Sequence, residues 1–148
     1  MYKTKIIDKL DAAFKLNNES LLFLSQEALL LRLPENRSNT IGSQLACVAR
    51  ARDAYTKAIL NDAPFSWNPD FPYDQRYDHN KLANHLNSKS SEYLEHINRL
   101  EAFSENQLDL IMDLISHEYL HQGQLIRYFY GNHITMPRGI KSFWHLED

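Results

Sequence analysis

The sequence has one cysteine, Cys47, and only four glycines and five prolines among its 148 residues. A single cysteine excludes an internal disulfide, so packing must stabilise the fold. Three of the prolines stand between residues 64 and 72, which leaves long stretches free of helix-breaking residues. This scarcity of breakers favours a mostly helical chain.

The sequence also lacks a strong charge excess and a long apolar run. Sixteen basic residues against nineteen acidic ones give a net charge of -3, without a basic stripe that would neutralise phosphates. No apolar run approaches the roughly 18 residues that span a bilayer, and the N-terminal residues MYKTKIIDKLDAAFKL lack the apolar core of a signal peptide. We therefore expect a cytoplasmic protein with no nucleic-acid partner and no membrane, folded as one domain over residues 1–148.

Apolar residues recur at helical spacing in the remaining stretches, which predicts four amphipathic helices. The first is expected to end before Pro34, and the second places Arg50, Arg52 and Asp53 mostly outside its apolar face. The apolar positions of the first three helices are Ile6, Leu10, Phe14, Leu21, Leu24, Ala28 and Leu31; Ile41, Leu45, Val48, Tyr55 and Ile59; and Leu82, Leu86, Tyr93, Ile97 and Leu100.

Capping residues stand at the expected ends of these helices. Thr40 or Asn39 precedes the second helix, and Asp78 precedes the third. The fourth begins at Ser104, where Gln107 completes a capping box, and Gly131 is well placed as the C′ residue at its other end.

The predicted helices are joined by connections of very different length. Only residues 101–103 join the third and fourth helices, so these should be antiparallel neighbours. The second and third are separated by the long segment NDAPFSWNPDFPYDQRY, whose aromatic residues either cap the core or form the rim or lid of a pocket. The predicted fold is an all-α four-helix bundle with a long crossover connection between helices 2 and 3.

The fourth helix contains the pattern H-E-x-x-H, from His117 to His121. Histidines four residues apart on a helix can both reach one metal ion, and Leu114, Leu125 and Tyr128 continue their face toward the core. In zinc proteases the glutamate of this pattern, here Glu118, is the general base. A protease also needs a third ligand downstream and a substrate-binding strand, and no strand-forming segment precedes the motif. A metal site of another kind is therefore the favoured interpretation.

Three stretches together resemble the DinB-like (YfiT-like) superfamily, the damage-inducible family. HEYLHQGQLIRYF looks like the last-helix signature of that family, with Gln122 at the usual arginine position. TIGSQLACVARARDAYTKAIL is similar to its second helix, and MPRGIKSFWHL resembles its closing tail. The resemblance implies a four-helix bundle, a homodimer and one divalent metal ion, zinc or nickel, held by three histidines.

His117 and His121 match two of those ligands, and Cys47 stands where the family has its helix-two histidine. Three arrangements are open. Cys47 can ligate as a thiolate; Gln44 or His85 can supply the third contact; or the histidines bond each other, a water or Tyr55 without a metal. Glu118 and Gln124 are candidates to orient the metal-binding side chains without binding the ion themselves.

Characterised members of the family look like thiol-dependent enzymes, which implies a transferase that joins a low-molecular-weight thiol to a small-molecule electrophile. The alternative is a non-catalytic bundle, a stress-response or interaction protein with a degenerate metal site. Arg127 and Arg138 can meet an anionic substrate near the last helix, although solvated side chains are the simpler interpretation.

Overall fold

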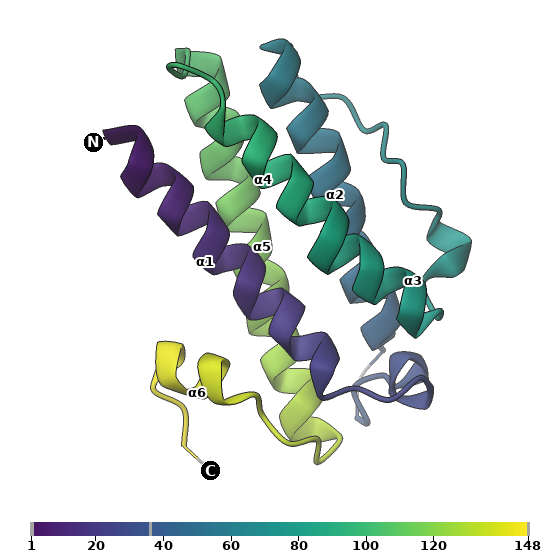
Figure 1. Ribbon diagram of the computed structural model, residues 1–148. Helices are drawn as coiled ribbons and strands as arrows, with labels where there is room; N and C mark the ends of the chain where they lie inside the picture. Colours follow the sequence, from purple (N-terminus) through teal and green to yellow (C-terminus); the bar gives the residue numbers. More distant parts are fainter. Residues whose placement is uncertain (1, 36, 148) are drawn as a thin grey trace.

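The computed structural model describes residues 2–35 and 37–147 and, within these ranges, contains helices and no strand (Figure 1). The predicted all-α class is therefore confirmed. Four long helical stretches form the body: α1 (Tyr2–Leu22), α2 (Ile41–Asn61), the run from α3 to α4, and α5 (Glu105–Gly131). No helix within the described ranges combines the length and apolarity needed to cross a membrane.

α1 ends earlier than the sequence predicts. The amides of Phe23 and Leu24 bond to carbonyls three residues back, at 3.3 and 3.2 Å, which tightens and closes the last turn. Ser25 Oγ then accepts a hydrogen bond from the Ala28 amide at 3.1 Å and starts the short helix η1 (Glu27–Leu30). The single helix expected up to Leu31 is thus wrong, although Leu24 and Ala28 are buried as predicted.

The predicted N-caps of the later helices are confirmed. Thr40 and Asp78 accept hydrogen bonds from the amides of Ser43 and Lys81, which begin α2 and α3 (His79–Asn84). Ser104 and Gln107 form the capping box at the start of α5.

The third helical stretch contains an irregularity that the sequence pattern does not indicate. Between α3 and α4 (Ser90–Asn98), residues His85–Lys89 form a π-helical turn, η3. Arg52 Nη1 donates to the Leu86 carbonyl at 3.1 Å, and Ser90 Oγ donates to the His85 carbonyl at 3.2 Å. Side-chain donors thus supplement the backbone hydrogen bonds of this wider turn.

The C-terminal end of α5 differs from the prediction. No described glycine has a positive φ, and Gly131 is the last helical residue. The left-handed residue is His133, at φ 56°, and the amides of Ile134 and His133 bond to the carbonyls of Phe129 and Tyr130 at 2.9 and 3.3 Å. His133, and not Gly131, therefore occupies the C′ position of a Schellman motif.

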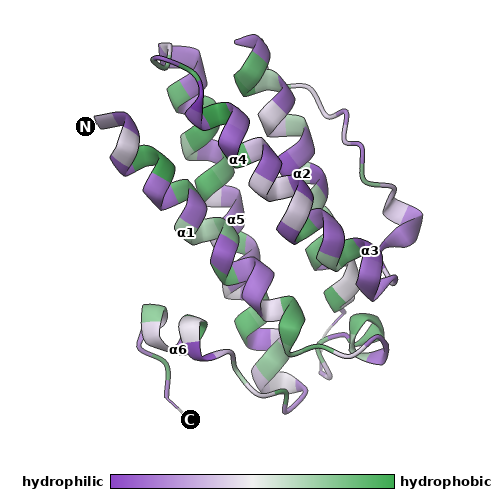
Figure 2. Cartoon of the chain, viewed as in Figure 1, coloured by the Kyte–Doolittle hydropathy of each residue, from purple (hydrophilic) through white to green (hydrophobic). Residues whose placement is uncertain are grey.

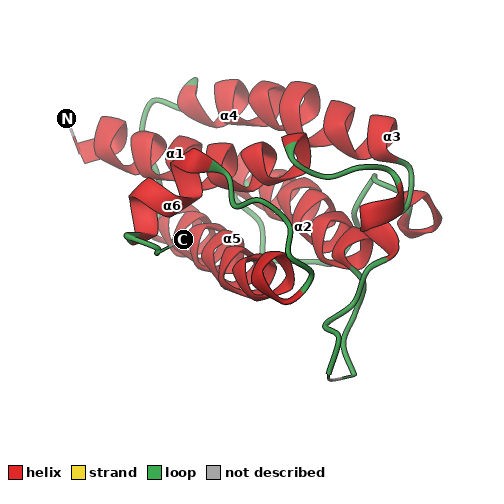
Figure 3. Ribbon diagram, turned by 90° about the horizontal axis from the view of Figure 1, so that it is seen from below, coloured by secondary structure: helices red, strands yellow, loops and turns green. Residues whose placement is uncertain are grey.

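The helices pack so that α5 contacts both α1 and α2, and α4 contacts the same two helices. The short helix α6 (Arg138–Trp144) lies against α1 (Figures 1 and 3). Each long helix carries both polar and apolar residues, as an amphipathic helix requires (Figure 2). The core comprises two apolar clusters, one containing Leu45 and Leu125 and the other Leu10 and Ile111.

A buried polar layer involves two charged residues of α2. Arg52 and Asp53 were expected mostly outside the apolar face of their helix, yet both are completely buried. A position outside the apolar face does not leave them exposed, because α2 is covered on more than one side, by α5, by α4 and by the long connection after it.

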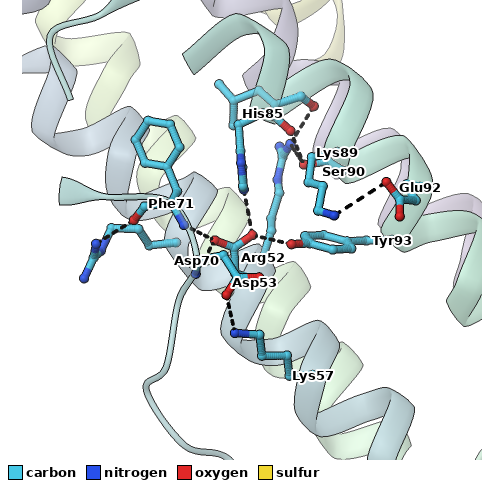
Figure 4. A network of polar contacts seen from close by, with 12 residues as sticks. Arg52, Asp53, Lys57, Asp70, Phe71, His85, Lys89, Ser90, Glu92 and Tyr93 are labelled. Atoms are coloured by element: carbon cyan, nitrogen blue, oxygen red, sulfur yellow. Dashed lines mark hydrogen bonds and ion pairs between the residues drawn. The ribbon is translucent and has the colours of Figure 1, made fainter. Parts of the chain in front are cut away.

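Asp53 holds that connection in place. Its Oδ2 accepts from the amides of Asp70 and Phe71 at 2.9 and 2.8 Å, and its Oδ1 accepts from His85 Nε2 at 2.6 Å and Tyr93 Oη at 2.7 Å (Figure 4). Burial raises the pKa of the Asp53 carboxyl, but the bonds from His85, Phe71 and Tyr93 outweigh it and lower the pKa below its usual range. Asp53 therefore stays ionised and joins α2, the connection and the third helical stretch.

The aromatic residues of the connection divide into two groups. Phe71 is a buried member of the core, and the partly buried Tyr77 packs against the same core. Phe65, Trp67 and Tyr73 are 43 to 50% exposed and lie outside the core. Whether these three form the rim or lid of a pocket stays a prediction.

Candidate metal centre

The packing of α2 on α5 brings together Cys47, His117 and His121. Nε2 of His117 lies 3.6 Å from Cys47 Sγ and 3.2 Å from Nε2 of His121. One potential ligand atom from each of the three residues lies within 4.8 Å of the other two. The site thus takes its cysteine from the middle of α2 and its histidines from one face of α5.

These separations can be compared with those around a tetrahedral zinc ion. Zinc–nitrogen bonds of about 2.1 Å and zinc–sulfur bonds of about 2.3 Å at tetrahedral angles place two nitrogens about 3.4 Å apart and a nitrogen and a sulfur about 3.6 Å apart. The two measured distances, 3.2 and 3.6 Å, agree with these values. Two of the three donor separations therefore match those around one tetrahedral ion, and the donor atoms of the third pair, Cys47 and His121, lie within 4.8 Å of each other.

Gln44 contacts the other nitrogen of the His121 ring. Its Oε1 lies 2.5 Å from His121 Nδ1, one turn before Cys47 on α2. A proton on Nδ1, donated to Gln44, leaves the lone pair of Nε2 directed at His117 and Cys47. Gln44 was considered as a third ligand, and the structure instead places it where it orients a ligand.

Burial sets the protonation of the three groups. It lowers the pKa of His121 to about 4, with a further contribution from His117, and it also lowers the pKa of His117. Both imidazoles are therefore neutral at pH 7, the state that metal ligation requires. Burial raises the pKa of the Cys47 thiol, against the opposing effect of Arg50. Binding of a metal through sulfur must then release the thiol proton.

Glu118 points away from the histidines into the buried polar layer. Its carboxylate lies 2.5 Å from Arg52 Nε and 2.5 Å from Asn17 Nδ2, and its side chain is fully buried. A general base of a protease must face a metal-bound water, which this carboxylate does not. Glu118 therefore contacts neither histidine through a hydrogen bond, although its charge opposes the lowering of the His117 pKa by burial.

The remaining candidates lie outside the cluster. Nε2 of His85 is bonded to Asp53, and Tyr55 stacks on Phe65 with ring centroids 4.4 Å apart. Two buried atoms near the cluster have no hydrogen-bond partner in the described residues, Oε1 of Gln124 and Nδ1 of His117. Gln124 is thus available to a ligand but does not contact either histidine through a hydrogen bond in the described residues.

Comparisons with protein families and other proteins identify no relative. No family model, no curated protein and no solved structure matches this chain.

Proposed function

We propose that the protein binds one divalent metal ion through Cys47 Sγ, His117 Nε2 and His121 Nε2. The observation that carries this proposal is the agreement of the two measured donor separations with tetrahedral coordination. One thiolate and two imidazoles suit zinc best and also accept nickel.

The geometry also supports assignment to the DinB-like superfamily. Cys47, chosen only because it occupies the helix-two ligand position of that family, lies beside the two histidines of the last helix. The packing of α1, α2, the α3–α4 stretch and α5 is compatible with the four-helix bundle and crossover order of the family. Homodimer formation belongs to the same proposal, and sedimentation of the purified protein tests it.

The activity that this site supports best is transfer of a low-molecular-weight thiol to a small-molecule electrophile. A divalent ion bound there supplies positive charge that makes a nearby thiol more acidic at neutral pH. His117 and His121 contribute neutral ligands, while Gln44 keeps the Nε2 lone pair of His121 available. With three protein ligands, one position stays open for substrate.

A second candidate is a non-catalytic helical protein that does not hold a metal. One observation favours it: the two histidines can satisfy each other, because their Nε2 atoms lie 3.2 Å apart, and burial keeps the Cys47 thiol protonated.

Elemental analysis of protein purified without an affinity tag or chelator separates the two candidates. We expect about one equivalent of a divalent ion in the wild type, from the single three-donor site, and a large loss in His117→Ala. His96→Ala, which alters a half-buried histidine of α4 outside the cluster, is the matched control. Equal, near-zero metal in all three proteins after incubation with zinc or nickel contradicts the site.

If metal is found, rates of thiol conjugation with and without the ion test the activity. No metal dependence across several thiols and electrophiles contradicts the transferase while leaving the metal site intact.

A further inference from the structure

A hollow of about 300 Å³ adjoins the candidate metal centre. Gln44, whose Oε1 contacts His121, forms part of its wall, together with Gln124 and Arg127 of α5. Gln44 thus separates the hollow from the three potential metal ligands. The volume of the hollow is at the lower end of the range for small-molecule pockets, which suits a compact ligand.

Two further hollows each share lining residues with the first and therefore adjoin it. Arg127 also lines one of about 390 Å³, and Asn39 also lines one of about 700 Å³. Arg32 and Arg37 line the last, beside the loop that leads into α2. The hollows are thus lined by three arginines and one acidic residue, Glu35, although the chain as a whole has a net charge of -3.

Two polar groups in the first hollow have no partner within residues 2–35 and 37–147. Arg127, an exposed residue, makes no hydrogen bond or ion pair with the protein there, and Gln124 Oε1 is buried without a donor. A guanidinium offers paired N–H donors that match a carboxylate, whereas an amide oxygen needs an N–H or O–H group. The guanidinium of Arg127 and the amide oxygen of Gln124 are therefore complementary to a ligand that has both an anionic group and a hydrogen-bond donor.

We propose that this hollow binds a small organic acid whose carboxylate pairs with Arg127 and whose amide N–H donates to Gln124 Oε1. A thiol derived from cysteine carries both groups within a few bonds of its sulfur, and in this hollow it would lie across the Gln44 side chain from His121. The proposal rests on the proposed function in taking this acid to be the thiol co-substrate. Recognition of the acid itself requires no metal.

The first test uses metal-free protein and a probe without sulfur, N-acetylalanine, titrated by isothermal calorimetry or by amide chemical shifts. We expect binding to weaken about tenfold or more in Arg127→Gln, the effect of losing a charged hydrogen-bonding group. Gln124→Leu should weaken it by a smaller factor. Arg99→Gln, which removes a surface arginine paired with Glu95 on α4, should bind as the wild type does.

Neutral and inorganic probes define the ligand class. N-acetylalaninamide lacks the charge and should bind at least about tenfold more weakly than the acid, because one charged hydrogen bond is lost. Equal binding of acid and amide, or unchanged binding in Arg127→Gln, overturns the proposal. Inorganic phosphate that binds more tightly than N-acetylalanine also overturns it, in favour of a phosphate ligand.

A second test separates this proposal from the proposed function. In cobalt-substituted protein, N-acetylcysteine should change the visible absorption of the ion at lower concentration than N-acetylcysteinamide does, and Arg127→Gln should remove the difference. If N-acetylalanine binds but N-acetylcysteine leaves the cobalt spectrum unchanged, the acid site stands and the thiol chemistry fails. If the spectrum changes equally with acid and amide, the thiol chemistry stands and the acid site fails.

Discussion

Arg52 Nε lies 2.5 Å from Glu118 Oε1, and solvent reaches neither side chain. The pair connects the middle of α2 to the residue that follows His117 on α5. Arg52 Nη2 also donates to the Phe14 carbonyl of α1 at 3.1 Å, and Asn17 of α1 bonds to the carboxylate. This ion pair therefore fixes the relative position of the two helices that carry the candidate ligands.

Removing one partner of this pair should destabilise the protein strongly. Arg52→Met leaves the Glu118 carboxylate buried without its counter-charge, which we expect to lower the free energy of unfolding by about 3–5 kcal/mol. The double variant Arg52→Met with Glu118→Met should be more stable than Arg52→Met alone, because no charge stays buried. Urea unfolding measures all three proteins.

The exposed pair of Arg99 and Glu95 is the control, and Arg99→Ala should change stability by no more than about 1 kcal/mol. A double variant no more stable than Arg52→Met alone would contradict the interpretation that the pair is one coupled unit.

Ligation by Cys47 can be tested spectroscopically. With cobalt(II) bound, wild-type protein should show a sulfur-to-metal charge-transfer band in the near ultraviolet, since Cys47 Sγ lies 3.6 Å from His117 Nε2. Cys47→Ser should lose this band and bind cobalt more weakly, while Cys47→His should lose the band but retain binding. A band that persists in Cys47→Ser would exclude the cysteine as a ligand, since the chain has no other.

The stability of the metal-free protein should depend on the protonation of His121. Burial lowers its pKa from 6.5 to about 4, so the unfolded state takes up a proton first as the pH falls. Stability is then full above about pH 6.5 and is lost progressively as the pH falls toward 4, by up to about 3 kcal/mol. Urea midpoints measured across this range check the slope.

His121→Gln should flatten that dependence and His96→Gln should not. His117, whose pKa burial also lowers, will contribute the slope that remains in His121→Gln. An unchanged slope in that variant would mean that His121 does not titrate as its burial predicts.

The left-handed conformation of His133 offers a stabilising substitution. A side chain at φ 56° costs about 1 kcal/mol or more relative to glycine, so His133→Gly should raise the melting temperature. His133→Ala should give no such gain, because alanine retains the Cβ atom. Thermal unfolding of both variants followed by circular dichroism distinguishes this conformational effect from loss of the imidazole.

Local signals in the sequence predicted helix starts better than helix ends. Thr40, Asp78 and Ser104 cap as expected, because a cap depends on residues within three positions of it. The end of α1 depends on the turn at Phe23 and on Ser25, within an apolar pattern that continues into η1, and the pattern alone cannot distinguish one helix from two.

Buried polar residues were the main failure of the helical-face argument. Arg52 and Asp53 are polar by type, and only partners from α1, α4, α5 and the long connection make their burial favourable. The spacing of His117 and His121 did identify a histidine pair on one face of the helix, and the structure places Cys47 beside this pair. The contact of Gln44 with Nδ1 of His121 depends on the register of α2 against α5, which no short motif encodes.

The carboxylate of Asp53 has a consequence for how the molecule opens. If the amides of Asp70 and Phe71 left Oδ2, the buried carboxylate would lose two hydrogen-bond donors. Detachment of this part of the connection alone therefore has a high free-energy cost. Hydrogen exchange at these two amides should accordingly occur only when α2 and η3 also come apart. A segment that resembles a loose surface loop thereby shares the cooperative unfolding unit of the core.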